Sequence, residues 1–154
     1  FMAMLLNDGK YGGQSYIEDS TLLEFTTCHY CDENRRAVGF DKPQMDYDKD
    51  GPTCQCISEK SFGHTGFTGT MAWADPKKKI VYVFLSNRIY PDSENKKLVK
   101  MNVRTDIMQA IYDAIEEGQE KEGKGEGIGI ESNEIINPPF SGAHQKNTVV
   151  TCWC

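Results

Sequence analysis

The stretch SFGHTGFTGTMAWADPKKKIVYVFLSN, residues 61–87, predicts two antiparallel strands joined by a turn. In the first strand, 67–74, Phe67, Met71 and Trp73 share one face, and Thr68, Thr70 and Ala72 share the other. The second strand, 79–87, is almost continuously apolar, as is typical of a strand buried on both faces. DPKKK at 75–79 suits the turn. A glycine in a strand marks either a bulge or a place where another group approaches the backbone, and composition alone favours a bulge at Gly66.

Helices are predicted on both sides of this hairpin. Residues 90–97 are expected to cap a helix that runs to about Glu117, with Asp92 or Ser93 as its N-cap. Its apolar stripe comprises Leu98, Met101, Ile107, Met108, Ile111, Ala114 and Ile115. The sequence therefore predicts an α+β fold, in which an antiparallel sheet packs against a carboxy-terminal helix.

The amino-terminal part predicts shorter elements. Residues 1–6 resemble the last turns of a helix that starts earlier, so the chain is expected to be a fragment. Residues 7–14 predict a turn, because glycine tolerates positive φ. A helix follows within 15–27, capped by Asp19 or Ser20 and burying Leu22, Leu23 and Phe25. Residues 35–40 predict a strand.

The composition excludes several classes of function. The net charge of −6 and the lack of a Lys/Arg cluster argue against nucleic-acid binding. The longest apolar runs are too short to cross a bilayer. Residues 118–154 are charged and rich in glycine at first, which predicts a disordered or atypical tail outside a domain of residues 1–117. No cofactor is predicted.

The six cysteines form three close pairs, Cys28/Cys31, Cys54/Cys56 and Cys152/Cys154. A CxxC followed by a CxC, with His29 adjacent, suits zinc. CxC is not the usual zinc-knuckle spacing, however, which favours disulfides or free cysteines.

His64-Thr65-Gly66 is the first candidate for chemistry. Threonine offers a hydroxyl, histidine a titratable donor, and glycine a backbone without a Cβ. The next backbone N–H, that of Phe67, could donate to a developing oxyanion.

This stretch and its neighbours resemble the carboxy-terminal part of the serine β-lactamase and penicillin-binding-protein-like superfamily, and more narrowly its class C-like and esterase-type hydrolases. In that family a [KH]-[TS]-G triplet lies on the strand that forms one wall of the active site. A turn with Asp-Pro and a strand that ends in Thr-Asn or Ser-Asn follow. Here these are His64-Thr65-Gly66, Asp75-Pro76 and Ser86-Asn87.

The resemblance covers residues 1–116 in the order of the family. MLLNDGKYGGQSYI (4–17) resembles the family's helix and turn ahead of the triplet, and RRAVGFD (35–41) its next strand. The family carries its nucleophile in Ser-x-x-Lys and a second motif in Tyr-x-Asn or Ser-x-Asn, both ahead of the triplet. Neither precedes His64 in this sequence.

The resemblance implies an exported bacterial serine hydrolase that cleaves an amide or ester through an acyl-enzyme. Thr65 would help to bind substrate, and the Phe67 N–H would form half of the oxyanion hole. Histidine in place of lysine weakens recognition of a β-lactam carboxylate, because histidine is only partly charged near neutral pH. The implied partners are a small-molecule or peptide-like substrate and the missing amino-terminal part or a fused domain. Without the nucleophile, the chain is expected to be inactive alone.

Two other motifs are interpreted as structural. Ser93-Glu94-Asn95-Lys96 matches Ser-x-x-Lys, but it follows the triplet and is expected to cap a helix. DYDKDG at 46–51 resembles half of a calcium loop, but position twelve is Ile57 rather than glutamate. An inactive binding or scaffold module on the same sheet and a small zinc module are the rival hypotheses.

Overall fold

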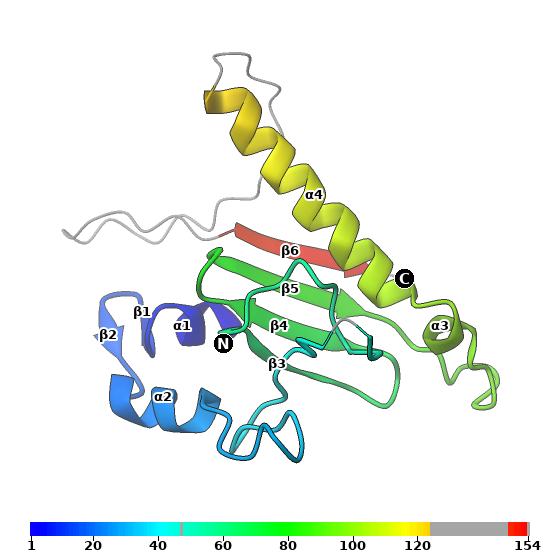
Figure 1. Cartoon of the computed structure of the whole chain (residues 1–154), viewed down its shortest axis with the longest axis horizontal. Helices are drawn as coiled ribbons and strands as arrows, with labels where there is room; N and C mark the ends of the chain where they lie inside the picture. Colours follow the sequence, from blue (N-terminus) through cyan, green and yellow to red (C-terminus); the bar gives the residue numbers. More distant parts are fainter. Residues whose placement is uncertain (47, 124–147, 154) are drawn as a thin grey trace.

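A computed structural model describes residues 1–46, 48–123 and 148–153 of the chain. Within these residues a sheet in the order β3-β4-β5-β6 lies between helices, and a separate two-stranded hairpin lies at its side (Figure 1). The elements are α1 (Met2–Leu6), β1 (Lys10–Tyr11), β2 (Gln14–Ser15), α2 (Asp19–Thr26), β3 (Phe62–Thr65), β4 (Met71–Asp75), β5 (Ile80–Leu85), α3 (Lys97–Lys100), α4 (Val103–Gly123) and β6 (Thr148–Trp153). In the described part of the chain, no helix combines the length and the apolar character that a membrane crossing needs.

The predicted hairpin is β4 and β5, which pair antiparallel with Trp73 opposite Tyr82. β3 pairs antiparallel with the other edge of β4. The prediction that the first strand starts at Phe67 is wrong. The Gly66 N–H donates to the Thr70 carbonyl at 2.7 Å and the Gly69 N–H donates to the Gly66 carbonyl at 3.0 Å, so residues 66–70 form the turn between β3 and β4.

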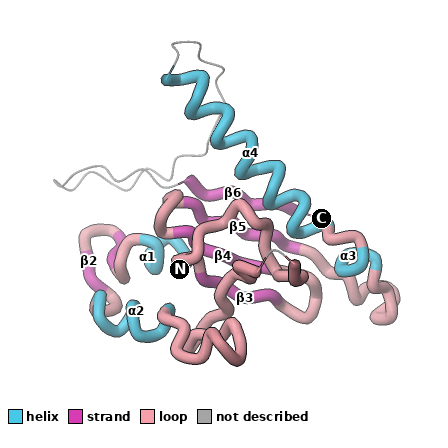
Figure 2. The backbone as a smooth tube through the Cα atoms, viewed as in Figure 1, coloured by secondary structure: helices cyan, strands magenta, loops and turns pink. Residues whose placement is uncertain are grey.

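Both faces of the sheet are covered, as the apolar run of β5 predicts. Alternate side chains of β4 and β5 enter two cores. The core on the α4 face is formed by Cys54, Ile57, Met71, Trp73, Ile80, Tyr82, Phe84, Met108 and Tyr112. The core on the α1 face is formed by Leu5, Leu6, Leu22, Phe62, Ala74 and Val81. The fold is therefore a mixed α+β arrangement in which helices sandwich a sheet (Figure 2).

The predicted long carboxy-terminal helix is divided into α3 and α4. Asn102 lies between them with a φ of 50°, a conformation that asparagine tolerates and that interrupts the helix. The predicted caps are wrong, because α3 begins only at Lys97. Asp92 instead accepts the N–H of Glu94 at 2.9 Å, which closes a local turn.

The amino-terminal predictions are met in part. Gly9, Gly12 and Gly13 have positive φ in the turn between α1 and β2. In α2 the N-cap is Glu18, which makes no side-chain capping bond, so neither Asp19 nor Ser20 caps the helix. Leu22 is buried, whereas Leu23 and Phe25 are exposed, contrary to expectation.

Residues 35–40 do not form the predicted strand. The Ala37 N–H donates to the Phe40 carbonyl at 2.8 Å, which makes a tight turn. Only isolated bridges are present, between Arg36 and Asp41 and between Asp41 and Gly63. Asp41 thereby covers the start of the outer edge of β3 and leaves its end open.

The carboxy-terminal region differs from the predicted tail. α4 continues past Glu117 to Gly123, and Thr148–Trp153 forms β6, which pairs in parallel with β5. The β-branched run Thr148, Val149, Val150 and Thr151 suits a strand, although no repeating pattern in the sequence indicates a partner. The predicted disorder of residues 124–147 lies outside the described residues.

Candidate functional site

The His64-Thr65-Gly66 triplet occupies the end of β3 and the start of the turn that follows. In the ladder, His64 lies opposite Ala72 and Thr65 lies opposite Met71. His64 and Gly66 are exposed and Thr65 is half-buried. The His64 ring Nδ1 lies 2.8 Å from the Thr65 carbonyl oxygen, so this contact is a hydrogen bond when Nδ1 carries the proton. The end of this edge strand is therefore open to a ligand.

Phe67 is the second residue of the turn, directly after Gly66, and its side chain is 74% exposed. The N–H groups of Gly66 and Gly69 make the bonds that close the turn. Among the described residues the Phe67 N–H has no hydrogen-bond acceptor. It is thus available as the donor to an oxyanion that the sequence predicts.

Two of the glycines in this stretch have packing reasons. A Cβ on Gly63 would lie 2.6 Å from the Trp73 ring and 2.3 Å from the Ala72 carbonyl oxygen. A Cβ on Gly66 would lie 2.3 Å from the Thr70 hydroxyl oxygen. The side chain of Thr70 therefore fills the space beside Gly66, and close packing alone explains a glycine there.

Two arginines lie against the same turn, and no pattern in the sequence predicted either of them there. The Arg88 N–H donates to the Thr68 carbonyl at 2.9 Å, and its guanidinium carbon lies 5.0 Å from the centre of the Phe67 ring. Arg104, in the first turn of α4, donates to the Gly69 carbonyl at 3.4 Å. The signal for Arg88 was its place directly after Ser86-Asn87, because antiparallel pairing returns the end of β5 to the turn before β4.

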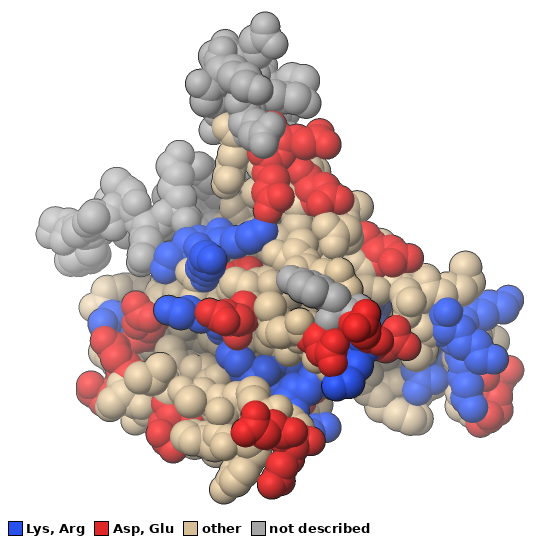
Figure 3. Space-filling view, viewed as in Figure 1, with Lys and Arg blue, Asp and Glu red and all other residues tan. Residues whose placement is uncertain are grey.

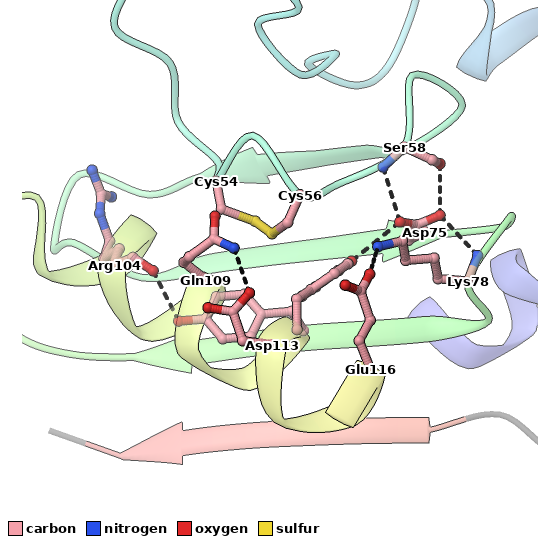
Figure 4. The surroundings of a disulfide bond; sticks show 11 residues. Cys54, Cys56, Ser58, Asp75, Lys78, Arg104, Gln109, Asp113 and Glu116 are labelled. Carbon is pink, nitrogen blue, oxygen red and sulfur yellow. Dashed lines mark hydrogen bonds and ion pairs between the residues drawn. A yellow bond between two sulfur atoms is a disulfide. The ribbon is translucent and has the colours of Figure 1, made fainter. Parts of the chain in front are cut away.

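The opposite end of the sheet is organised around the buried carboxylate of Asp75 (Figure 4). Oδ1 accepts the Ser58 hydroxyl at 2.6 Å and the N–H groups of Lys77 and Lys78 at 3.0 and 3.1 Å. Oδ2 accepts the Ser58 N–H at 3.0 Å and the Tyr112 hydroxyl at 3.3 Å. Burial and then the charge of Asp75 raise the pKa of Tyr112. Because this carboxylate is enclosed by donors, it holds a loop, a turn and α4 together.

A cavity of about 610 Å³ lies away from the triplet, between α1, α2 and the loops at 42–45 and 59–60. Lys42 lines it, and burial lowers the pKa of this amine to about 8, an effect that Glu59 partly opposes. The Lys42 ammonium donates to the Lys60 carbonyl at 3.2 Å. None of the four predicted site residues lines this cavity.

The cysteines form disulfides in the two pairs that the structure describes in full, Cys28–Cys31 and Cys54–Cys56. These four cysteines are therefore disulfide-bonded rather than zinc-binding or free. A disulfide sulfur is not a thiolate and does not bind zinc as a cysteine ligand does. In the described ranges no three His, Cys, Asp or Glu side chains gather in a metal-binding arrangement. Cys152 lies on β6 and packs on the α4-face core, and Cys154 lies outside the described residues.

The described residues of the two other motifs, at 93–96 and 46–51, lie in loops. Ser93 and Asn95 lie in the exposed segment before α3, so Ser93 and Lys96 do not share a helical turn. In the acidic loop, Asp46 accepts the Asp48 N–H at 3.2 Å and pairs with Lys49 at 2.7 Å, which lowers the pKa of Asp46.

Comparisons with known proteins identify the family of the chain. The family model described as Beta-lactamase matches residues 4–102, and the chain belongs to that family. A protein of Salmonella enteritidis PT4 named "Putative D-alanyl-D-alanine carboxypeptidase" is 31% identical over 101 residues, which is 63% of this chain and 22% of that protein. A protein of the same name from Salmonella paratyphi B is 30% identical over 103 residues, with the same shares. The chain thus spans about a fifth of the length of these relatives. No solved structure matches the chain.

The family and these names show a serine-hydrolase family, and they confirm the predicted resemblance and fold class. The roles of His64, Thr65, Gly66 and Phe67 remain predictions.

Proposed function

We propose that this chain forms one wall of the active site of a serine hydrolase that cleaves an amide or ester through an acyl-enzyme. The observation that supports this most is the open end of β3, where the triplet is exposed and the Phe67 N–H has no acceptor within the described residues. An N–H aimed at the developing negative charge of a carbonyl oxygen stabilises acyl transfer. The name of the Salmonella relatives supports a peptide-like substrate.

The proposed roles follow from the position of each group. The Thr65 hydroxyl binds the substrate beside the strand, and the Phe67 N–H supplies half of the oxyanion hole. The other half of the oxyanion hole, the nucleophilic serine and its base would come from the Ser-x-x-Lys and Tyr-x-Asn motifs. Neither motif occurs in this sequence ahead of His64. The chain alone is therefore proposed to be inactive. We infer an exported location from the resemblance to the family, whose members are commonly exported.

A fluorophosphonate or penicillin probe tests the inactivity of the chain. No covalent adduct is expected by mass spectrometry of the 154-residue chain, and Ser93→Ala should behave in the same way. An adduct that Ser93→Ala abolishes would show that Ser93 is the nucleophile and would overturn the proposal.

An inactive binding or scaffold module is the second candidate, because the close packing of Thr70 explains Gly66 without a substrate. Sequencing the gene upstream of the codon for Phe1 separates the two. Ser-x-x-Lys followed by Tyr-x-Asn in frame would support the hydrolase, and an upstream domain without them would support the scaffold.

In a longer protein that contains these motifs, Phe67→Pro would test the oxyanion role, because proline has no N–H. Acylation should slow about 100-fold or more. Phe67→Ala, which keeps the N–H, is the matched control. Equal rates for the two variants would contradict the proposed role.

A further inference from the structure

The cavity between α1 and α2 lies beside the start of β3, whereas the triplet lies at the end of that strand. Its volume of about 610 Å³ is in the range of small-molecule sites. Apolar side chains from four segments line it, namely Leu5, Leu6, Leu22, Leu23, Met45 and Phe62. Leu23 and Met45 are exposed, so the apolar lining continues to the mouth of the cavity. A small apolar group that enters would therefore be removed from water.

Lys42 brings an amine to this apolar cavity. The residue is half-buried, and its side-chain nitrogen donates to the Lys60 carbonyl at 3.2 Å. The ion pairs among the described residues do not include Lys42. Burial penalises the charged form of a lysine, and in this part of the chain no carboxylate pairs with Lys42 to compensate. The neutral amine is therefore favoured relative to that of an exposed lysine.

The charges around the cavity favour a neutral ligand. Asp8 and Asp19 line the cavity, and Asp19 pairs with Lys10 at 3.3 Å. Glu59 raises the pKa of Lys42, but burial has the larger effect and lowers that pKa to about 8. The surface over α2 is mainly uncharged, with acidic side chains at its margins (Figure 3). These carboxylates oppose the binding of an anion, whereas a neutral carbonyl compound meets no such repulsion.

We propose that Lys42 binds a small apolar aldehyde in this cavity as a reversible imine. The neutral nitrogen attacks the carbonyl carbon, and its proton passes to the carbonyl oxygen to give a carbinolamine. Loss of water then forms the C=N bond, and addition of water reverses the step without an oxidant or a reductant. The apolar walls hold the hydrocarbon part of the aldehyde. This binding does not depend on the hydrolase proposal, because none of the four predicted site residues lines the cavity.

Reductive trapping of the 154-residue chain tests the imine. Hexanal and sodium cyanoborohydride, which converts an imine to a stable secondary amine, are added at pH 7, and the modified lysines are quantified by peptide mapping and mass spectrometry. Lys42 should be trapped at least about tenfold faster than Lys60, an exposed lysine that lines the same cavity, because an exposed amine is almost entirely protonated at this pH. Equal rates at Lys42 and Lys60 would overturn the proposal.

A second aldehyde separates a binding site from a merely reactive amine. Glycolaldehyde has only two carbons and carries a hydroxyl group, so it gains little from apolar walls. The ratio of the trapping rates at Lys42 and Lys60 should therefore be at least about threefold larger with hexanal than with glycolaldehyde. The same ratio with both aldehydes would show a reactive amine without a site for an apolar group, and the proposed class of ligand would be wrong.

Variants at the mouth of the cavity test where the aldehyde binds. Leu23→Ser removes an exposed apolar side chain that lines the cavity, and it should slow the trapping of hexanal at Lys42 about threefold. Val38→Ser is the matched control, because Val38 is also exposed but does not line the cavity, and it should leave the rate unchanged. Equal effects of the two variants would contradict binding in this cavity.

Discussion

The two ends of the sheet differ in whether their charged side chains have partners of opposite polarity. At the β4–β5 turn, one buried carboxylate, that of Asp75, accepts five hydrogen bonds. At the β3–β4 turn, the guanidinium groups of Arg88 and Arg104 have no carboxylate partner within the described residues, and the Phe67 side chain is exposed. A satisfied buried charge rigidifies a structure, whereas unsatisfied groups at an open edge are typical of binding sites.

This difference indicates that one end of the sheet stabilises the fold and the other end is available for binding. The Asp75 end joins the loop that contains the Cys54–Cys56 disulfide, the hairpin and α4, and thus holds the strands in register. The triplet end depends on that register for its geometry. Changes at the first end should therefore alter stability, and changes at the second should alter binding.

The largest effect is expected for Asp75→Asn. Both carboxylate oxygens of Asp75 accept hydrogen bonds. The side-chain NH₂ group of the asparagine would replace one of these acceptors and would therefore face another hydrogen-bond donor. The free energy of unfolding should fall by about 3 kcal/mol, as for other buried charged acceptors. Urea or thermal denaturation of the chain measures this loss.

Asp113→Asn is the matched control for this change. Asp113 also accepts a side-chain hydrogen bond, from Gln109 at 2.7 Å, but on the exposed face of α4. Its replacement should cost less than about 0.5 kcal/mol. Similar losses for the two variants would contradict the central role of Asp75.

A smaller and pH-dependent effect is expected for Tyr112→Phe. Below pH 10 the loss of the bond to Asp75 should cost about 1 kcal/mol. The pKa of Tyr112 is raised in the folded state, so above pH 10 the unfolded chain releases this proton while the folded chain keeps it. Wild-type stability should therefore fall as the pH rises through that range, and the difference from Tyr112→Phe should shrink.

Chemical denaturation at pH 8 and at pH 11 measures this change. Tyr16→Phe, at an exposed position, is the control and should show no such convergence. A constant difference between wild type and Tyr112→Phe at both pH values would argue against a buried, un-ionised hydroxyl at position 112.

The smallest effect on stability is expected for Arg88→Gln, at the other end of the sheet. Loss of the contact with Phe67 is offset by relief of the repulsion of Arg104, so the free energy of unfolding should change by no more than about 0.5 kcal/mol. Thermal denaturation checks this. A loss of unfolding free energy as large as that of Asp75→Asn would show that the β3–β4 turn also stabilises the fold. The proposed contrast between the two ends of the sheet would then be wrong.

Local patterns in the sequence predicted the elements that repeat regularly and missed those that depend on distant partners. The alternation at 67–74 and the apolar run at 79–87 were sufficient to predict β4 and β5, because burial on one or both faces leaves a direct pattern. The alternation placed the start of β4 too early, because residues 66–70 form a turn. β6 was missed because a parallel pairing at the edge of the sheet depends on β5, which is distant in sequence. The strand proposed at 35–40 was wrong because Ala37 and Phe40 close a turn instead.

For the candidate site, the sequence determined the identity and order of the groups: a histidine, a threonine and a glycine before Phe67, without a nucleophile motif ahead of them. Only the tertiary structure placed Arg88 and Arg104 on that turn and enclosed Asp75 within hydrogen-bond donors. The physical reason is that the order of residues is a local property of the chain. Burial, charge repulsion and hydrogen-bond satisfaction arise between segments that meet only when the sheet and α4 pack together.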